Sequence, residues 1–236
     1  DCLLEAIDIR RNTVLVPALP FASSMKEHLD LHSVFDVRSA PNAMGTISSL
    51  VMRRDGALRS VHPTHSVAAL GPRAQVYVGG HHRGRTPFGE GSPYMRLQQE
   101  RGQVLMFGVG LNSVTNFHVY EDMLGALLPF KVYGDREYSV ECFDADGNRL
   151  DVITACHSPA MWAKRDGERA RKRLLAARRI HTLKLGEGEV SLLDARGLTL
   201  TLLEMLLEGE SIYGSVTLSS EQRGAAERSL SELQCR

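Results

Sequence analysis

The feature that most constrains the fold is that the apolar residues of this sequence come in short runs of two kinds. Residues 104–107 form an unbroken apolar run typical of a buried strand, whereas residues 198–207 have the spacing of one face of a helix. No run approaches the about 18 apolar residues that a membrane-spanning helix needs. The chain has 236 residues, 43% of them hydrophobic, which is enough to bury a sizeable core. The pattern predicts a globular α/β protein without a membrane span.

Neither an internal repeat nor a low-complexity linker divides the sequence, so we expect one domain over residues 1–236. Strand-like and helix-like segments are mixed rather than strictly alternating, which favours a mixed, partly antiparallel sheet flanked by helices over a doubly wound parallel sheet. We expect strands at 13–16 and 104–107, strands or short helices at 66–70 and 75–78, and a hairpin over 132–154. We also expect helices at 44–52, 163–179 and 198–207, a loop and helix over 111–128, and a loop at 18–42.

Charge and cysteine content exclude some classes of function. The 28 basic and 28 acidic side chains balance to a formal net charge of zero, so the chain lacks the strong positive field that attracts nucleic acid. The four cysteines are far apart and form no Cys-x-x-Cys pair. We therefore expect free thiols in a reducing cytoplasm. Because the chain opens at Asp1, with no methionine and no signal peptide, we also expect the natural protein to begin further upstream.

The stretch from residue 105 to residue 121 carries the most chemistry. A buried strand runs into a glycine turn, and Asn112 and Ser113 are placed to cap the helix that follows. The backbone N–H groups at a helix start can stabilise the oxyanion formed when a thioester carbonyl is attacked. His118 and Glu121 are three residues apart and share a helical face, so the carboxylate can orient the imidazole. The same pair is also compatible with a half-buried histidine bonded to a surface glutamate.

Several blocks in succession resemble the aminoglycoside N3-acetyltransferase family, in that family's order and at similar spacing. They are Phe-Asp (35–36), Pro-Asn-Ala-Met-Gly-Thr-Ile-Ser (41–48), Arg-Ser-Val-His-Pro-Thr-His-Ser-Val-Ala-Ala-Leu-Gly (59–71), Phe-Gly-Glu-Gly-Ser-Pro-Tyr (88–94) and the segment 111–121. The likeness is strong over residues 35–122 and looser to about residue 213. The resemblance implies an α/β acetyltransferase of the antibiotic N-acetyltransferase kind, with acetyl-CoA as cosubstrate and a small-molecule amine as acceptor.

The resemblance also implies roles for individual residues. His118 matches the family's general base and Glu121 its orienting partner, and a base is needed because only the deprotonated amine attacks. Positions on the acetyl-CoA side are matched by Asn112, Ser113, Thr115, Arg59, His62 and Ser66, and the acceptor side by Asp36. Each of these has a structural alternative: Ser113 and Asp36 as caps, Arg59 in an ion pair, and His62 as a hydrogen-bonding group beside a turn.

No metal site is expected. Although His62, His65, His81 and His82 are close in sequence, Pro63 disrupts helical spacing and no carboxylate or cysteine completes a ligand set. Covalent catalysis by Ser66 is disfavoured because the Gly-x-Ser-x-Gly elbow is missing.

The sequence departs from the family in two ways. The family's N-terminal segment, which helps to form the CoA site, has no counterpart here, and the chain is neutral where enzymes that bind a polycation need an acidic cleft. Residues 164–173 are distinctly basic, which fits either a solvated helix face or a phosphate site. The acceptor therefore stays open among aminoglycosides, amino sugars and other biosynthetic amines. The alternatives are another acyl donor, a carrier-bound or phosphate-containing acceptor, and a non-catalytic CoA-binding relative. A homodimer is compatible with the sequence.

Overall fold

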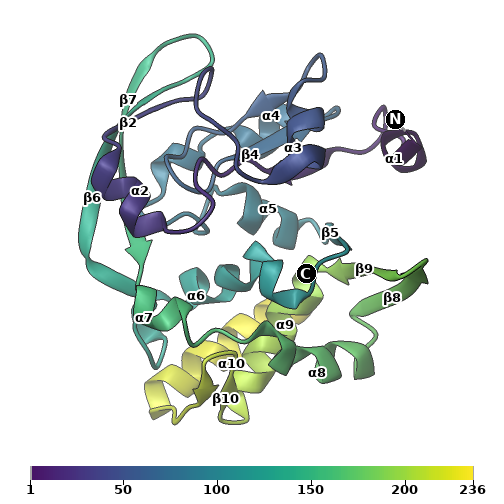
Figure 1. Cartoon of the computed structure of the whole chain (residues 1–236). Helices are drawn as coiled ribbons and strands as arrows, with labels where there is room; N and C mark the ends of the chain where they lie inside the picture. Colours follow the sequence, from purple (N-terminus) through teal and green to yellow (C-terminus); the bar gives the residue numbers. More distant parts are fainter. Residues whose placement is uncertain (1, 236) are drawn as a thin grey trace. The chain divides into compact units, whose positions relative to one another are not determined.

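The computed structural model describes residues 2–235, whose contacts divide the chain into two compact units. Unit 1 comprises Asp1–Pro93 and Gly134–His157, and unit 2 comprises Tyr94–Tyr133 and Ser158–Arg236. Small sheets flanked by helices give the mixed α/β class that the sequence predicts (Figure 1). That residues 1–236 act as one domain stays a prediction.

The first sheet of unit 1 is antiparallel and has the order β1-β4-β3. Its central strand, β4 (Val67–Leu70), is buried at every position, which explains why residues 67–70 form an unbroken apolar run. The flanking strands are β1 (Val14–Pro17) and β3 (Leu58–Arg59). The helices of this part of the chain are α1 (Cys2–Ile7), α3 (Gly45–Met52) and α4 (Ala74–Val78), of which α3 and α4 contact β4. These elements agree with the predicted strands and with the predicted helix at 44–52.

The second sheet of unit 1 is mixed, because β2 (Val34–Asp36) runs parallel to β6 (Tyr133–Phe143). Strand β7 (Arg149–His157) pairs on the other side of β6 and completes the predicted hairpin. Phe35 lies opposite Cys142 in the register, and both side chains are buried.

The prediction of a loop over residues 18–42 is wrong, because this segment contains both β2 and the helix α2 (Met25–Leu31). The Ser24 hydroxyl accepts a hydrogen bond from the Glu27 backbone N–H at 3.2 Å and caps α2. Ser-x-x-Glu is the sequence pattern of a helix start. The weak apolar periodicity of the segment concealed this short helix, of which only Met25 and Leu29 are buried.

The core of unit 2 is built around α9 (Ala195–Leu207), ten of whose residues are buried. The Asp194 carboxylate caps this helix by accepting from the backbone N–H groups of Arg196 and Gly197. Helix α10 (Ser220–Cys235) packs beside α9 (Figure 1). The predicted helix at 198–207 is thus confirmed, and it extends three residues further toward the N-terminus.

The sheet of unit 2 is antiparallel, with β9 (Gly188–Asp194) between β5 (Gln103–Phe107) and β8 (Ile180–Leu185). Gly108 follows the end of β5 and has a φ of +67°, which is accessible to glycine at little cost. Helix α5 (Pro93–Gln99) precedes β5, and the two-residue strands β10 (Glu210–Ser211) and β11 (Gly214–Ser215) form a hairpin after α9.

The loop and helix expected over residues 111–128 form as a series of short helices. The segment consists of the 3-10 helices η2 (Leu111–Ser113) and η3 (Thr115–His118), the α-helix α6 (Val119–Leu124) and the 3-10 helix η4 (Gly125–Leu127). Asn112 and Ser113 do not cap it, since they lie inside η2, whose N-cap is Gly110 and has no side-chain bond. The Asn112 side-chain oxygen instead accepts from the Gly167 backbone N–H at 2.6 Å.

The basic segment is also less helical than predicted for residues 163–179. It contains the short helix α7 (Pro159–Trp162), the 3-10 helix η5 (Gly167–Ala170) and α8 (Arg171–Ala176). The Asp166 carboxylate accepts from the Glu168 backbone N–H and so starts a new helix within the run of charged residues.

Between residues 2 and 235, every helix is too short or too polar to cross a bilayer. All four cysteines are free, as predicted; Cys2 and Cys235 are exposed, whereas Cys142 and Cys156 are buried.

Candidate functional site

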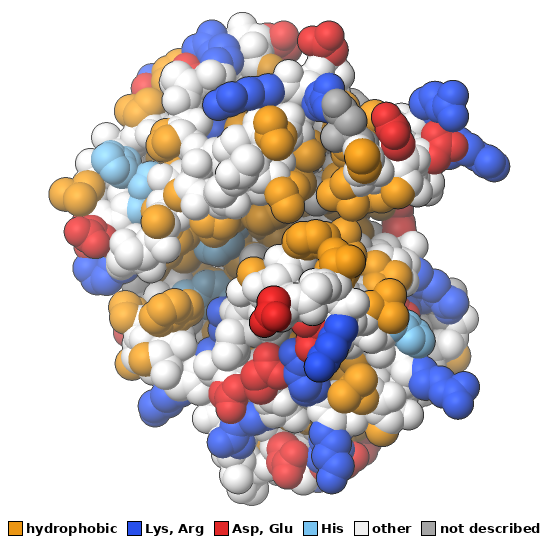
Figure 2. Space-filling model, turned by 45° about the vertical axis from the view of Figure 1, so that its right-hand side comes forward, with side chains coloured by type: hydrophobic (Ala, Val, Ile, Leu, Met, Phe, Trp, Pro, Cys, Tyr) orange, Lys and Arg blue, Asp and Glu red, His pale blue; other side chains and the backbone are white. Residues whose placement is uncertain are grey.

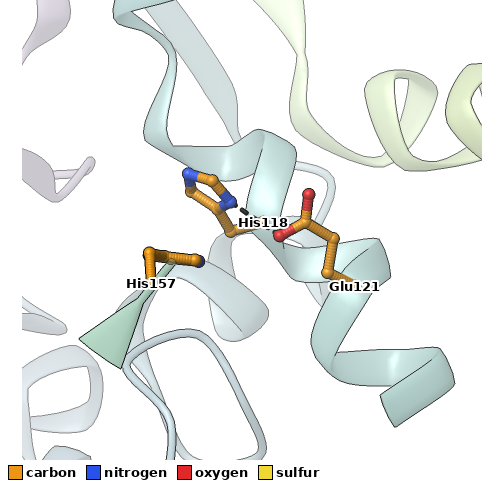
Figure 3. A group of neighbouring side chains, drawn as sticks. All are labelled: His118, Glu121 and His157. Carbon is orange, nitrogen blue, oxygen red and sulfur yellow. Dashed lines mark hydrogen bonds and ion pairs between the residues drawn. The ribbon is translucent and has the colours of Figure 1, made fainter. Parts of the chain in front are cut away.

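His118 and Glu121 form a buried hydrogen-bonded pair in unit 2. His118 is the last residue of η3 and Glu121 lies in the first turn of α6, so the spacing of three residues brings the two side chains together. The imidazole Nδ1 lies 2.7 Å from the Glu121 Oε2 atom (Figure 3). The side chains expose only 7% and 0% of their surface, so water competes little for this bond.

The second carboxylate oxygen of Glu121 is held from a distant part of the chain. The Tyr213 hydroxyl donates to Oε1 at 2.7 Å, from the turn that joins β10 to β11. Burial and the nearby Glu121 carboxylate raise the pKa of Tyr213, so the phenol keeps its proton and acts as a donor. Sequence analysis missed Tyr213, which is 92 residues from Glu121 and belongs to no motif.

The second ring nitrogen of His118, Nε2, contacts an arginine. The Arg165 Nη1 atom lies 3.0 Å from the His118 Nε2 atom, and Nη2 donates to the Asn112 carbonyl oxygen at 2.7 Å. In the sequence, Arg165 stood out only as one member of the basic segment 164–173.

These neighbours assign the tautomer of His118. An ionised carboxylate only accepts hydrogen bonds and a guanidinium only donates them. Nδ1 therefore carries the proton that is donated to Glu121, and Nε2 presents its lone pair to Arg165. A neutral imidazole with its lone pair on Nε2 is the form in which a histidine acts as a general base.

The residues predicted on the acetyl-CoA side divide between the units. Asn112, Ser113 and Thr115 lie in unit 2, in the two 3-10 helices that lead to His118; Ser113 is exposed and Thr115 is half-buried. The backbone and side-chain oxygens of Asn112 are both bonded, to Arg165 and Gly167. Asn112 thereby links the start of this segment to the loop that carries Arg165.

Arg59 and Ser66, in unit 1, are engaged within that unit. The Arg59 guanidinium donates to the Ser66 hydroxyl at 3.0 Å and to the carbonyl oxygens of Ala18, Ala40 and Pro41. Burial lowers the pKa of Arg59 to about 10. These bonds tie three backbone segments together, which favours a structural role, and the predicted role of both residues toward acetyl-CoA stays a prediction.

His62 is fully buried in unit 1. Its Nδ1 atom accepts from the backbone N–H groups of Thr64 and His65 at 3.3 and 3.1 Å, and its ring stacks on His81 with the centroids 4.5 Å apart. Burial holds the pKa of His62 well below its usual value, and the neighbouring histidines act in the same direction. The neutral ring therefore supports the turn that follows it, which is the structural alternative raised by the sequence.

Asp36, predicted on the acceptor side, ends β2 in unit 1. Its carboxylate binds the Arg38 guanidinium at 2.9 and 2.6 Å and accepts from the Arg38 backbone N–H. These bonds hold the pKa of Asp36 down at about 2. The carboxylate is thus ionised at neutral pH, as an amine-binding role requires, but it already has a cationic partner.

Most arginines of the basic segment that follow Arg165 are paired with carboxylates of unit 2. Arg171 binds Glu168 and Glu189, while Arg173 binds Glu208 and Glu210. Acidic and basic side chains are interspersed on the face shown in Figure 2, in keeping with the zero net charge. These pairs favour a solvated, charge-balanced surface over a phosphate site.

Comparison with known proteins identifies the family. Residues 10–206 match the family described as aminoglycoside 3-N-acetyltransferase. The chain belongs to this family. The matched range contains His118, Glu121 and Arg165, whereas Tyr213 lies beyond it.

Among aminoglycoside 3-N-acetyltransferases, aminoglycoside N(3)-acetyltransferase III from Salmonella sp is 39% identical over 77 residues, which is 33% of this chain and 27% of that relative. The chain thus spans little more than a quarter of the length of that curated relative. A solved structure of AAC-VIa bound to sisomicin is 26% identical with a TM-score of 0.61, covering 80% of this chain and 76% of that one. The structure of AAC-IIIb in a binary complex with CoASH is 22% identical with a TM-score of 0.66, covering 88% of this chain and 80% of that one, and it shares the fold.

Proposed function

We propose that this chain is an acetyl-CoA-dependent N-acetyltransferase in which His118 is the general base. The observation that carries the proposal is the buried Nδ1–Oε2 bond of 2.7 Å between His118 and Glu121, which leaves Nε2 as the basic nitrogen. Membership of the aminoglycoside 3-N-acetyltransferase family supports the reaction class.

The base has a defined task in this reaction. Acetyl-CoA supplies an acetyl group activated as a thioester. As the acceptor nitrogen attacks the carbonyl carbon, the new C–N bond forms, the C–S bond breaks and the thiolate leaves. The nitrogen must lose a proton, which His118 Nε2 accepts. Glu121 then stabilises the imidazolium through Nδ1, and the Tyr213 hydroxyl keeps the carboxylate aimed at the ring.

On the cosubstrate side, Ser113 and Thr115 are the best-placed members of the predicted set. They precede His118 by five and three residues, and neither side chain is fully buried. We retain them for the thioester and pantetheine arm. Asn112 supports the site indirectly, because its two oxygens accept hydrogen bonds from Arg165 and from the Gly167 backbone N–H.

For the acceptor, we propose the primary amine of an aminoglycoside or a related amino sugar. The family supports this choice, and the sisomicin-bound AAC-VIa structure shows that a relative 26% identical to this chain binds an aminoglycoside. A phosphate-containing acceptor gains little support, because Arg171 and Arg173 are already paired.

The test is release of free CoA thiol from acetyl-CoA, with a panel of aminoglycosides, amino sugars and nucleotide-linked amino sugars as acceptors. His118→Ala is compared with His181→Ala, which removes an exposed histidine of β8. We expect amine-dependent release that falls by about 10²- to 10⁴-fold in His118→Ala and is unchanged in His181→Ala. Equal turnover in the two variants would remove His118 from the mechanism. Binding of CoA without release for any amine would point to another acyl donor or acceptor.

A further inference from the structure

Arg165 is hydrogen-bonded to His118 Nε2, the nitrogen that accepts the proton in the proposed mechanism. Its Nη1 atom is 3.0 Å from His118 Nε2, which is the distance at which an acceptor amine would have to lie for proton transfer. A guanidinium remains charged at any pH at which the protein is folded, so this neighbour cannot itself take the proton. The acceptor nitrogen and Arg165 therefore compete for one lone pair.

The backbone around Arg165 is fixed from three sides. The Asp166 N–H donates to the Ile212 carbonyl at 2.8 Å, the Gly167 N–H to Asn112 Oδ1 at 2.6 Å, and the Glu168 carboxylate accepts from the Leu111 N–H at 3.0 Å. A Cβ at position 167 would lie 2.9 Å from the Phe117 ring, so glycine is required for this close approach. These contacts hold the backbone from which the Arg165 guanidinium reaches His118.

The other groups of unit 2 in this network are the Glu121 carboxylate and the phenols around it. Glu121 bonds to Nδ1 and Tyr213 bonds to Glu121. Burial raises the pKa values of Tyr120 and Tyr133, and nearby carboxylates raise them further: Asp122 for Tyr133, and Glu121 for both. Among these groups, Arg165 places a positive charge next to Nε2.

We infer that Arg165 is a positioning residue that caps the general base until an acceptor arrives. This inference rests on the proposed function, because it assigns a step to the same site. In the resting protein the guanidinium holds His118 as the Nδ1–H tautomer and occupies the lone pair of Nε2. When an acceptor enters, its nitrogen replaces Nη1 at Nε2 and the guanidinium turns away, retaining or exchanging its bond to the Asn112 carbonyl. No covalent bond forms or breaks in this exchange.

The cap also bears on the charge of the acceptor. An ammonium group and a guanidinium repel each other, so a cationic amine cannot reach Nε2 while Arg165 remains there. Removing the charge should therefore ease acceptor binding and, at the same time, allow the base to take up a proton at a higher pH than in the wild type. A residue with only a structural role would change neither property.

The experiment compares the wild type with Arg165→Ala, Arg165→Gln and Arg165→Lys. Glutamine keeps an N–H donor without charge, and lysine keeps charge without the planar fork. Arg169→Ala is the matched control, because Arg169 is an exposed arginine of the same loop whose ion pair is with Asp166. The first readout is an NMR pH titration of the histidine ring protons in the free protein, with the His118 signal assigned by its loss in His118→Ala. The second is the pH profile of kcat/KM for acetyl transfer.

We expect the His118 titration midpoint and the acid limb of the profile to move to higher pH by about one pH unit in the alanine and glutamine variants. The lysine variant should remain near the wild type, and the Arg169→Ala control should not move. A midpoint that moves by less than about 0.3 pH unit in the alanine and glutamine variants would overturn the inference. Because the NMR titration needs no turnover, a wild type without acetyl transfer would refute the proposed function and leave the role of Arg165 separately tested.

Discussion

The hydroxyl of Tyr213 offers the sharpest test of the buried network. Tyr213→Phe removes one donor from the Glu121 carboxylate and leaves the aromatic ring, which packs on Phe130 with the centroids 5.1 Å apart. The Glu121 side chain is 0% exposed, so water is poorly placed to replace the lost bond of 2.7 Å. A hydrogen bond to a charged group contributes about 1.5–3 kcal/mol, and we expect a loss of about 2 kcal/mol in the free energy of unfolding.

Urea unfolding measures this loss as a shift in the transition midpoint at constant slope. With a slope of about 2–3 kcal/mol per molar, the transition that contains unit 2 should move down by about 0.7–1 M. The matched control is Tyr133→Phe, which removes a hydroxyl bonded to Asp122 at the same distance of 2.7 Å. Asp122 is half-exposed, so water can replace that bond and the cost should be about 1 kcal/mol or less. An equal or smaller loss in Tyr213→Phe than in the control would refute the claim that Tyr213 stabilises a buried carboxylate.

Three further outcomes follow from burial and close contact. Because burial lowers the pKa of His62 below its usual 6.5, the unfolded chain binds a proton that the folded chain does not. Stability should therefore fall as pH drops below about 6.5, by at most about 1.4 kcal/mol per pH unit from this residue, and urea midpoints should show a weaker acid dependence in His62→Asn. The burial that raises the pKa of Cys142 to about 12 and of Cys156 to about 11 should leave only Cys2 and Cys235 reactive toward a disulfide reagent at pH 8, with all four reacting in denaturant. Gly167→Ala should cost about 1–3 kcal/mol in thermal or urea unfolding, whereas Gly188→Ala, whose Cβ would lie 3.5 Å from the Leu185 carbonyl, should cost less.

Features encoded over short stretches of sequence were predictable. The i, i+3 spacing of His118 and Glu121 forecast their contact, and the apolar spacing over 198–207 forecast α9. In each case the residues that interact, or that share an environment, lie within a few turns or one strand of each other. Local periodicity is therefore sufficient information.

Features that depend on partners far away in the sequence were not predictable. Tyr213 and Arg165 meet the pair from 92 and 47 residues away, and neither position has a neighbouring residue that signals its role. The same reasoning explains the errors at Asn112 and over residues 18–42. A polar residue after a turn was interpreted as a helix cap, although its oxygen is bonded 55 residues away, and the helix start at Ser24 was concealed by weak periodicity.

The sequence separations within this network also set an order during synthesis. His118 and Glu121 leave the ribosome almost together and can pair at once, whereas Arg165 follows later and Tyr213 later still. Contacts of such long separation form late because the intervening chain must first be ordered. Until the β10–β11 turn docks, Glu121 lacks the phenol that satisfies its second oxygen, so a nascent or C-terminally shortened chain would hold the carboxylate in a site that is only partly built. Premature termination just after α9 should therefore disturb residues that lie nearly a hundred positions earlier.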